Sequence, residues 1–101
     1  MSSSGGSSGG GSTETRDIAI GLYGGGYHKV VRNGAETFYV YDGITRTFDV
    51  GDVIEITYYP ESGKRLGYWY VDDEQASEAN PYTVTVGTTV QNEIYNTWTD
   101  A

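Results

Sequence analysis

Cysteine is absent from this 101-residue chain, and histidine and methionine each occur once. The missing cysteines exclude disulfides and thiolate metal sites, and a single histidine leaves too few imidazole ligands for a transition-metal centre. No run of apolar residues approaches the ~20 that a membrane-spanning helix needs. Small domains commonly use a disulfide or a bound metal for stability. This chain must therefore gain its stability from buried side chains, and we expect no cofactor and no insertion into a membrane.

Basic residues are also scarce. The chain has 6 Lys and Arg against 14 Asp and Glu, which gives a formal net charge of −8 at pH 7. The basic residues form no cluster or stripe, so the composition argues against nucleic acid and against an anionic membrane surface as partners. Solubility explains the excess of negative charge, and a surface for a cation or a basic partner is the alternative.

Residues 1–12 consist of Gly and Ser after the initial Met and carry no charged side chain. Such a segment buries too little surface to fold, so we expect a disordered, flexible leader, either a natural linker or an added tag. It has neither the basic start nor the apolar run of a signal peptide. We expect one folded module over residues 17–98.

Aromatic residues are abundant, with 10 Tyr, 2 Trp and 2 Phe in the chain. Apolar and polar residues alternate with a period of two in most of the sequence, which is the pattern of half-buried strands. The clearest example is Val53–Tyr59, where Ile54, Ile56 and Tyr58 share one face. The pattern predicts strands along the whole module, with large rings supplying much of the buried area.

Turn signals separate the alternating runs. Asn-Gly at 33–34 is the strongest, because both central positions of a type I′ turn need a positive φ. Asp-Gly at 42–43 and Gly-Asp at 51–52 predict two more hairpins, so that consecutive strands form an antiparallel meander. Residues 72–80 form a polar loop with room for one helical turn. We therefore predict an all-β fold, a small antiparallel β-sandwich or barrel-like domain of about seven or eight short strands. The alternative is a β-grasp-like sheet with one short helix.

Trp69 is the expected centre of the core. Leu66 lies three residues before it, so a regular pleat cannot point both side chains inward, and we predict a one-residue bulge at Gly67. The closing strand is expected to place Val90, Ile94 and Trp98 on one face. The predicted structural core comprises Ile54, Ile56, Leu66, Trp69, Val71, Tyr82, Val84, Val86 and Ile94.

From about residue 44 to 98 the chain resembles the divergent bacterial B-repeat domain, which is related to the internalin B-repeat. The similar features are a Gly-Asp turn at 51–52, the alternating strand at 53–58, the aromatic strand around Trp69 and the run Asn-Pro-Tyr-Thr-Val-Thr-Val at 80–86. Tyr68 stands where the family pattern has Gly, and Asn96 stands where it has a small residue.

The resemblance implies a non-catalytic structural or adhesive spacer module of a bacterial cell-surface or secreted repeat protein, hence an extracellular location. Its expected partners are neighbouring modules of the same chain, and the isolated domain is expected to be a monomer. One alternative is a module that binds a surface glycan or protein through exposed tyrosines. Another is a domain on the surface of a phage virion.

The candidate binding residues are tyrosines that alternation places on outer faces. If Trp69 points inward, its two neighbours point outward. Exposed aromatic rings with polar tips suit recognition, whereas cross-strand pairing of tyrosines on a solvated face is the alternative explanation. These candidates are Tyr39, Tyr41, Tyr68 and Tyr70.

No pattern in the chain points to catalysis, and we do not expect an enzyme. His28 has no serine motif near it, and the acidic run at 72–74, with Glu78, lacks the spacing of a calcium loop. Lys29 and Asn96, with Glu55 or Glu93, supply the residue types of an intramolecular isopeptide bond, although nothing in their spacing requires contact.

Overall fold

The computed structural model describes residues 14–101, and this part of the chain is all-β, with nine strands in two sheets. The predicted fold class, a small β-sandwich domain, is therefore confirmed. The strands are β1 (Thr15–Gly21), β2 (Tyr27–Arg32), β3 (Glu36–Val40), β4 (Ile44–Asp49), β5 (Val53–Tyr59), β6 (Lys64–Val71), β7 (Glu74–Ser77), β8 (Tyr82–Thr85) and β9 (Glu93–Asp100). They extend slightly beyond the predicted module, 17–98, and the predicted leader, 1–12, lies outside the described residues.

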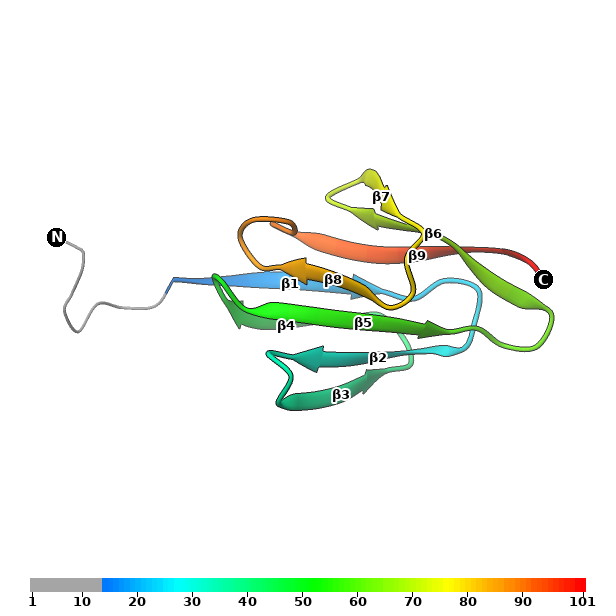
Figure 1. Ribbon diagram of the computed structural model, residues 1–101, viewed down its shortest axis with the longest axis horizontal. Coiled ribbons are helices and arrows are strands. Elements are labelled where there is room, and N and C mark those ends of the chain that lie inside the picture. The colour runs from blue at the N-terminus through cyan, green and yellow to red at the C-terminus, as the bar shows by residue number, and fades with distance from the viewer. Residues whose placement is uncertain (1–13) are drawn as a thin grey trace, which may run out of the picture.

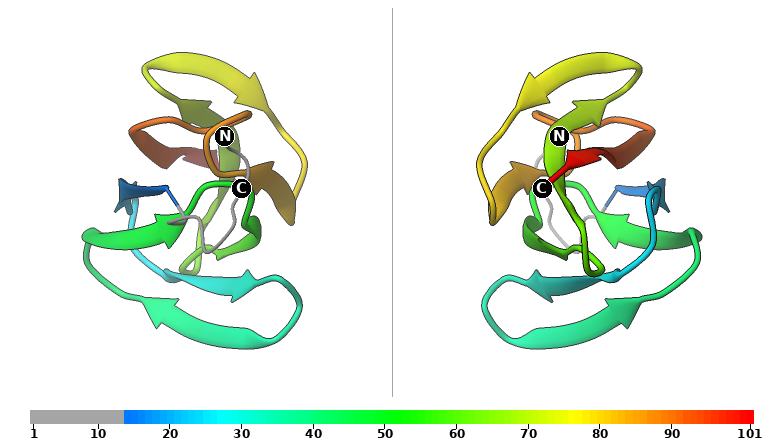
Figure 2. Two further views of the ribbon diagram at one scale, coloured as in Figure 1. Left: turned by 90° about the vertical axis from the view of Figure 1, so that its left-hand side faces the viewer. Right: turned by 90° about the vertical axis from the view of Figure 1, so that its right-hand side faces the viewer.

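One sheet has five strands in the order β4-β1-β9-β6-β7, and the other has four in the order β3-β2-β5-β8. Every pair is antiparallel except β1 and β9, which run parallel. Figure 2 looks along the strands and shows both sheets surrounding a common interior. No helix in the described part of the chain is long and apolar enough to cross a membrane.

The strand count is nine because the predicted polar loop at 72–80 contains β7. Asp72 and Asp73 have φ angles of 52° and 66°, so they form a tight turn that returns the chain against β6. Aspartate tolerates this left-handed conformation better than most residues. The helical turn for which this loop has room does not form, and the β-grasp-like alternative does not describe residues 14–101.

The predicted meander is wrong in its connections. The Asn33-Gly34 hairpin is confirmed, with φ angles of 54° and 68° at its two central residues. In contrast, the turns at 42–43 and 51–52 carry the chain from one sheet to the other. Among the described strands, only β2–β3 and β6–β7 are hairpins within a sheet. Alternation identifies the inward face of a strand, but it does not tell which sheet contains the strand.

The interior is lined by side chains from both sheets. Of the predicted core, Leu66 and Tyr82 are partly buried, and the other residues are buried, with Trp69 at 0% exposure. Strands before residue 50 also contribute to the core, through Ile18, Ile20, Val30, Val40 and Phe48. Two polar side chains, His28 and Asn96, are also fully buried among them.

Trp98 does not join Val90 and Ile94 in the core, because its side chain is 42% exposed. This end of β9 lies against the glycine loop that follows β1, and a Cβ atom on Gly24 would lie only 2.4 Å from the Trp98 ring. The ring covers the loop and packs beneath the Lys64 ammonium, 4.6 Å from its centroid. Trp98 therefore closes one end of the sandwich.

The predicted bulge is confirmed in β6. Leu66 pairs with Trp98 and Trp69 with Asn96, so three steps along β6 oppose two along β9. A Cβ atom on Gly67 would lie 2.7 Å from Thr97 Oγ1, which explains the glycine at this position. Thr97 Oγ1 instead accepts a hydrogen bond from the Tyr68 amide at 2.9 Å.

The first and last strands lie side by side in the middle of the five-stranded sheet. Because they are parallel, β1 enters at one end of the sandwich and β9 leaves at the opposite end. Figure 1 shows this arrangement, with the start of β1 on the left and the end of β9 on the right.

Candidate functional site

Tyr39 and Tyr41 lie in a group of four tyrosines on the outer face of the four-stranded sheet, completed by Tyr27 and Tyr59. We call this group the four-tyrosine cluster. The Tyr27 ring stacks on Tyr59 at 4.9 Å and contacts Tyr41 at 5.6 Å and Tyr39 at 6.0 Å. The Tyr39 and Tyr41 rings stack at 6.4 Å and are 50% and 67% exposed. Two of these contacts, Tyr27–Tyr59 and Tyr39–Tyr41, are stacked pairs, whereas Tyr27 meets Tyr39 edge to face.

Tyr68 and Tyr70 lie on the other sheet, so the four predicted tyrosines do not form one site. Tyr70 stacks on Tyr95 of β9 at 5.4 Å and an interplanar angle of 6°. Tyr23 meets Tyr95 edge to face at 5.5 Å. Desolvation and the nearby carboxylates of Asp73 and Glu93 raise the pKa of Tyr95 above its ordinary value.

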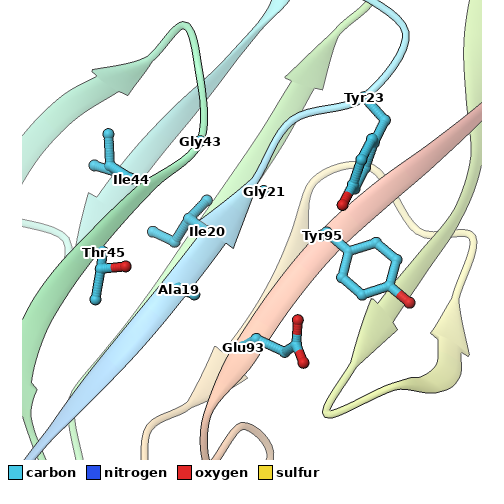
Figure 3. Close-up of a pocket in the computed structure, with 9 residues that line it drawn as sticks. All are labelled: Ala19, Ile20, Gly21, Tyr23, Gly43, Ile44, Thr45, Glu93 and Tyr95. Atoms are coloured by element: carbon cyan, nitrogen blue, oxygen red, sulfur yellow. The ribbon is translucent and has the colours of Figure 1, made fainter.

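A shallow trough lies beside this second group, along the outer face of β1 (Figure 3). Its volume is about 280 Å³, and it exists because Ala19, Gly21 and Gly43 present little or no side chain there. Thr45 of β4 lies on one side of it and Glu93 of β9 on the other. A hydroxyl, a carboxylate and the tyrosine phenols therefore surround a small apolar floor.

The most connected polar group is the side chain of Asn96, which lies opposite Trp69 in the interior. Its Nδ2 donates to the carbonyl oxygen of Tyr23 at 3.1 Å, and its Oδ1 accepts from the amide of Tyr23 at 3.2 Å. These two hydrogen bonds to the backbone of Tyr23 continue the β1–β9 pairing, which ends at Gly21 and Tyr95. The amide also reaches the other sheet, because Oδ1 contacts His28 Nε2 at 2.9 Å.

His28 is held as a neutral imidazole. Asn96 Oδ1 can only accept, so Nε2 carries the proton and Nδ1 is bare, buried and without a partner. Desolvation lowers the pKa of His28 to about 4, and the hydrogen bond to Asn96 opposes this shift only in part. The rings of Trp69 and Tyr58 pack on the imidazole at 5.2 and 5.6 Å. The His28–Asn96 pair therefore joins the two sheets. Both side chains are inaccessible to solvent, whereas acid–base chemistry on a substrate would require access.

The residues of the possible isopeptide bond are not brought together. His28 and Asn96 point into the interior, so Lys29 points to the outer face of its sheet, beside Thr57 and Tyr39. Glu55 is exposed on that same sheet, and Glu93 borders the trough on the other. Lys29 and Glu55 thus lie on the outer face of one sheet, Glu93 lies on the outer face of the other, and Asn96 lies in the interior between them.

Asp72, the first residue of the acidic run after β6, has a structural role. The Asp72 carboxylate accepts hydrogen bonds from the backbone amides of Gln91, Asn92 and Glu93 at 2.7–3.2 Å, which fixes the turn before β9. Within residues 14–101, no three His, Cys, Asp or Glu side chains are grouped so that they could hold a metal ion.

Sequence reasoning missed Tyr23, Tyr27, Tyr59 and Tyr95, which complete the two aromatic groups. It noted Asn96 but not its role, although one signal was present: Ile94 points inward, so alternation places Asn96 inward as well. A polar side chain at an inward position of a strand must find partners there.

Comparisons with family models, with curated proteins and with solved structures give no match for this chain.

Proposed function

We propose that this chain is a non-catalytic spacer module that holds the segments joined to its two ends at a fixed separation. The observation that supports this proposal is the parallel pairing of β1 and β9, which places the entry and exit of the chain at opposite ends of the sandwich. Antiparallel terminal strands would instead bring the two ends to the same side. The resemblance to bacterial B-repeats adds the proposed setting, a repeat protein on a cell surface or in the secreted fraction.

Two further features favour a spacer that stays extended. The interior is continuous from sheet to sheet, with fourteen hydrophobic residues buried, so the module is a single rigid body. The formal net charge of −8 makes copies of the module repel one another, which opposes side-by-side association. In this role the partners are neighbouring modules, and the isolated domain is a monomer.

Two copies joined directly, Asp100 of the first to Thr15 of the second, are expected to be rod-like in solution. Small-angle scattering should give a maximum dimension close to twice that of one copy. The matched control joins the same copies through residues 1–12, whose Gly/Ser composition is that of a flexible linker, and should give a broader distance distribution. Directly joined copies that scatter like one compact particle would contradict the proposal.

A second candidate function is saccharide binding in the trough along β1. It is favoured by the combination of an apolar floor with the Glu93 carboxylate and the Thr45 hydroxyl, which can accept and donate hydrogen bonds to a sugar. The test is a chemical-shift titration with a panel of oligosaccharides. Saturable shifts at Thr45 and Tyr95 that are lost in Glu93→Gln and kept in the remote variant Tyr41→Ala support binding. A panel that leaves these signals unmoved rules it out for those sugars.

A further inference from the structure

We propose that β1, β9 and the Asn96 side chain form a mechanical clamp that resists force applied through the two ends of the module. This inference rests on the proposed spacer function, because a spacer between two attached segments transmits any tension between them. We refer to these three parts as the terminal-strand clamp. The proposal gives the module a further function, which is to stay folded while it is stretched.

The direction of the load follows from the topology. Tension applied through the two ends draws β1 toward its own N-terminus and β9 toward its own C-terminus (Figure 1). The two strands are parallel neighbours, so they are pulled past each other along their length. Their hydrogen bonds lie across this direction and are loaded together. A pull that separates two strands from one end, which we call peeling, loads one pair of hydrogen bonds at a time and needs much less force.

The clamp contains both backbone and side-chain hydrogen bonds, which follow one another along the two strands. Residues 19–21 pair with residues 93–95, and the amide of Ala19 donates to the carbonyl of Asn92 at 2.9 Å. Beyond this pairing β1 leaves the sheet, and there Asn96 takes over with its two bonds to the backbone of Tyr23. The amide thus lengthens a short parallel pairing at the point where it would otherwise end.

Neither strand of the clamp lies at the edge of the sheet. The far side of β1 pairs with β4 along six residue pairs, from Thr15↔Asp49 to Ile20↔Ile44, and the far side of β9 pairs with β6. Removing β1 or β9 from the sheet therefore requires breaking two ladders at once. Both flanking pairings are antiparallel and run along the same axis, so they too are loaded along their length.

Side-chain packing adds a barrier to sliding. Ile20 and Ile94 are register partners and are each 1% exposed, so a shift of one strand drags both side chains through a close-packed interior. The next pair, Gly21 and Tyr95, approaches so closely that a Cβ atom on Gly21 would lie 3.0 Å from that of Tyr95. Such interlocked contacts must break before the strands can move.

Single-molecule stretching of one protein in two directions tests the clamp. The chain has no cysteine, so paired cysteines attach handles at chosen points. Ser12→Cys with Ala101→Cys pulls the two ends apart and loads the clamp. Ser62→Cys with Ala101→Cys pulls β6 and β9 apart from their common end, because Lys64 pairs with Asp100, and so peels them. Rupture force reports the unfolding rate under load, and we expect it to be at least about twofold higher in the first direction.

A matched pair of substitutions tests the contribution of Asn96. Asn96→Ala removes both bonds to Tyr23, whereas Val84→Ala removes buried volume from β8, outside the clamp. For each variant, the loss of end-to-end rupture force is divided by the loss of thermal stability. This ratio should be larger for Asn96→Ala than for Val84→Ala. The comparison of pulling directions needs no substitution in the clamp, so it decides the proposal even where Asn96→Ala does not fold.

The outcomes separate this inference from the spacer function. Equal rupture forces in the two directions, with joined copies that scatter as a rod, overturn the clamp and leave the spacer intact. Joined copies that fold back on each other overturn the spacer, whatever the rupture forces are. A third outcome is a higher rupture force in the end-to-end direction that Asn96→Ala lowers no more than Val84→Ala does. This result would show that the β1–β9 strand pair resists the force without a contribution from Asn96.

Discussion

Trp69→Ala is expected to destabilise the domain by about 3–5 kcal/mol, which is the usual cost of removing a large aromatic side chain from a packed core. Trp69 is 0% exposed, and its Nε1 donates to the carbonyl of Ala79 at 2.7 Å. Its ring also packs on His28 and Tyr82, at 5.2 and 6.4 Å. Whole domains are stable by only about 5–15 kcal/mol, and small ones lie at the lower end. Urea unfolding followed by circular dichroism should therefore find the variant largely unfolded near body temperature.

Trp98→Ala is the matched control for this prediction. The second tryptophan is 42% exposed and its main polar contact is the Lys64 ammonium above its ring. A cation–π contact of this exposed kind contributes about 0.5–1 kcal/mol. The control should therefore shift the urea midpoint far less than Trp69→Ala does. A Trp69→Ala protein that unfolds at the same urea concentration as the parent would show that the indole is not the centre of the core.

Acidification from pH 6.5 to pH 4 is expected to cost about 3 kcal/mol of stability through His28 alone, because its pKa falls from 6.5 in the unfolded chain to about 4 in the folded one. The folded state holds the imidazole neutral, since Nδ1 lies buried with no partner. Between these two pH values the unfolded chain binds a proton that the folded chain does not. The full stabilisation is therefore present above pH 6.5, decreases as the pH falls, and is lost below about pH 4.

The measurement is a series of urea unfolding curves between pH 7.5 and pH 4 for the parent and for His28→Gln. The groups that face the imidazole are Asn96 of β9, Trp69 of β6 and Tyr58 of β5, and none of these changes charge in that range. The variant should be less stable at pH 7.5 and yet lose less stability on acidification. If parent and variant lose stability in parallel, proton binding by His28 is not the cause. A chemical-shift titration of the imidazole gives an independent check.

Local chemistry predicted the local features of this fold well. The alternation at 53–59 correctly distinguishes inward Ile54 and Ile56 from outward Glu55, and the glycine at 67 correctly marks the bulge. Both features depend on a few neighbouring residues, which the sequence displays directly. The same holds for the turn at 33–34, whose positive φ angles require residues such as Asn and Gly.

Connections between sheets could not be predicted in this way. A short Asp-Gly segment at 42–43 is compatible with a hairpin, yet here it carries the chain across to the other sheet. Whether this segment forms a hairpin or a crossover depends on which strand pairs with β4. That strand is β1, some thirty residues earlier in the chain. An example of the pairing is Thr47, whose hydroxyl donates a hydrogen bond to the Asp17 carboxylate at 2.6 Å. Pairings between distant segments are set by the packing of the whole interior rather than by the turn.

The candidate sites show the same limit. Outward-pointing tyrosines such as Tyr41 were recognisable from alternation, but their neighbours were not, because Tyr27 and Tyr59 come from different strands. The β1–β9 pairing, on which the spacer and clamp proposals depend, joins the two ends of the folded chain. Nothing in either segment indicates its partner.

The position of β1 between β4 and β9 also determines when the protein can finish folding during its synthesis. Residues 19–21 emerge from the ribosome more than seventy residues before their partners, so one edge of the first strand waits unpaired while the rest of the chain is made. The interior stays open for the same time, because Ile94 and Asn96 arrive last. Folding should therefore be slow, as expected when contacts join distant parts of a chain, and until β9 arrives the unpaired edge of β1 is open to aggregation.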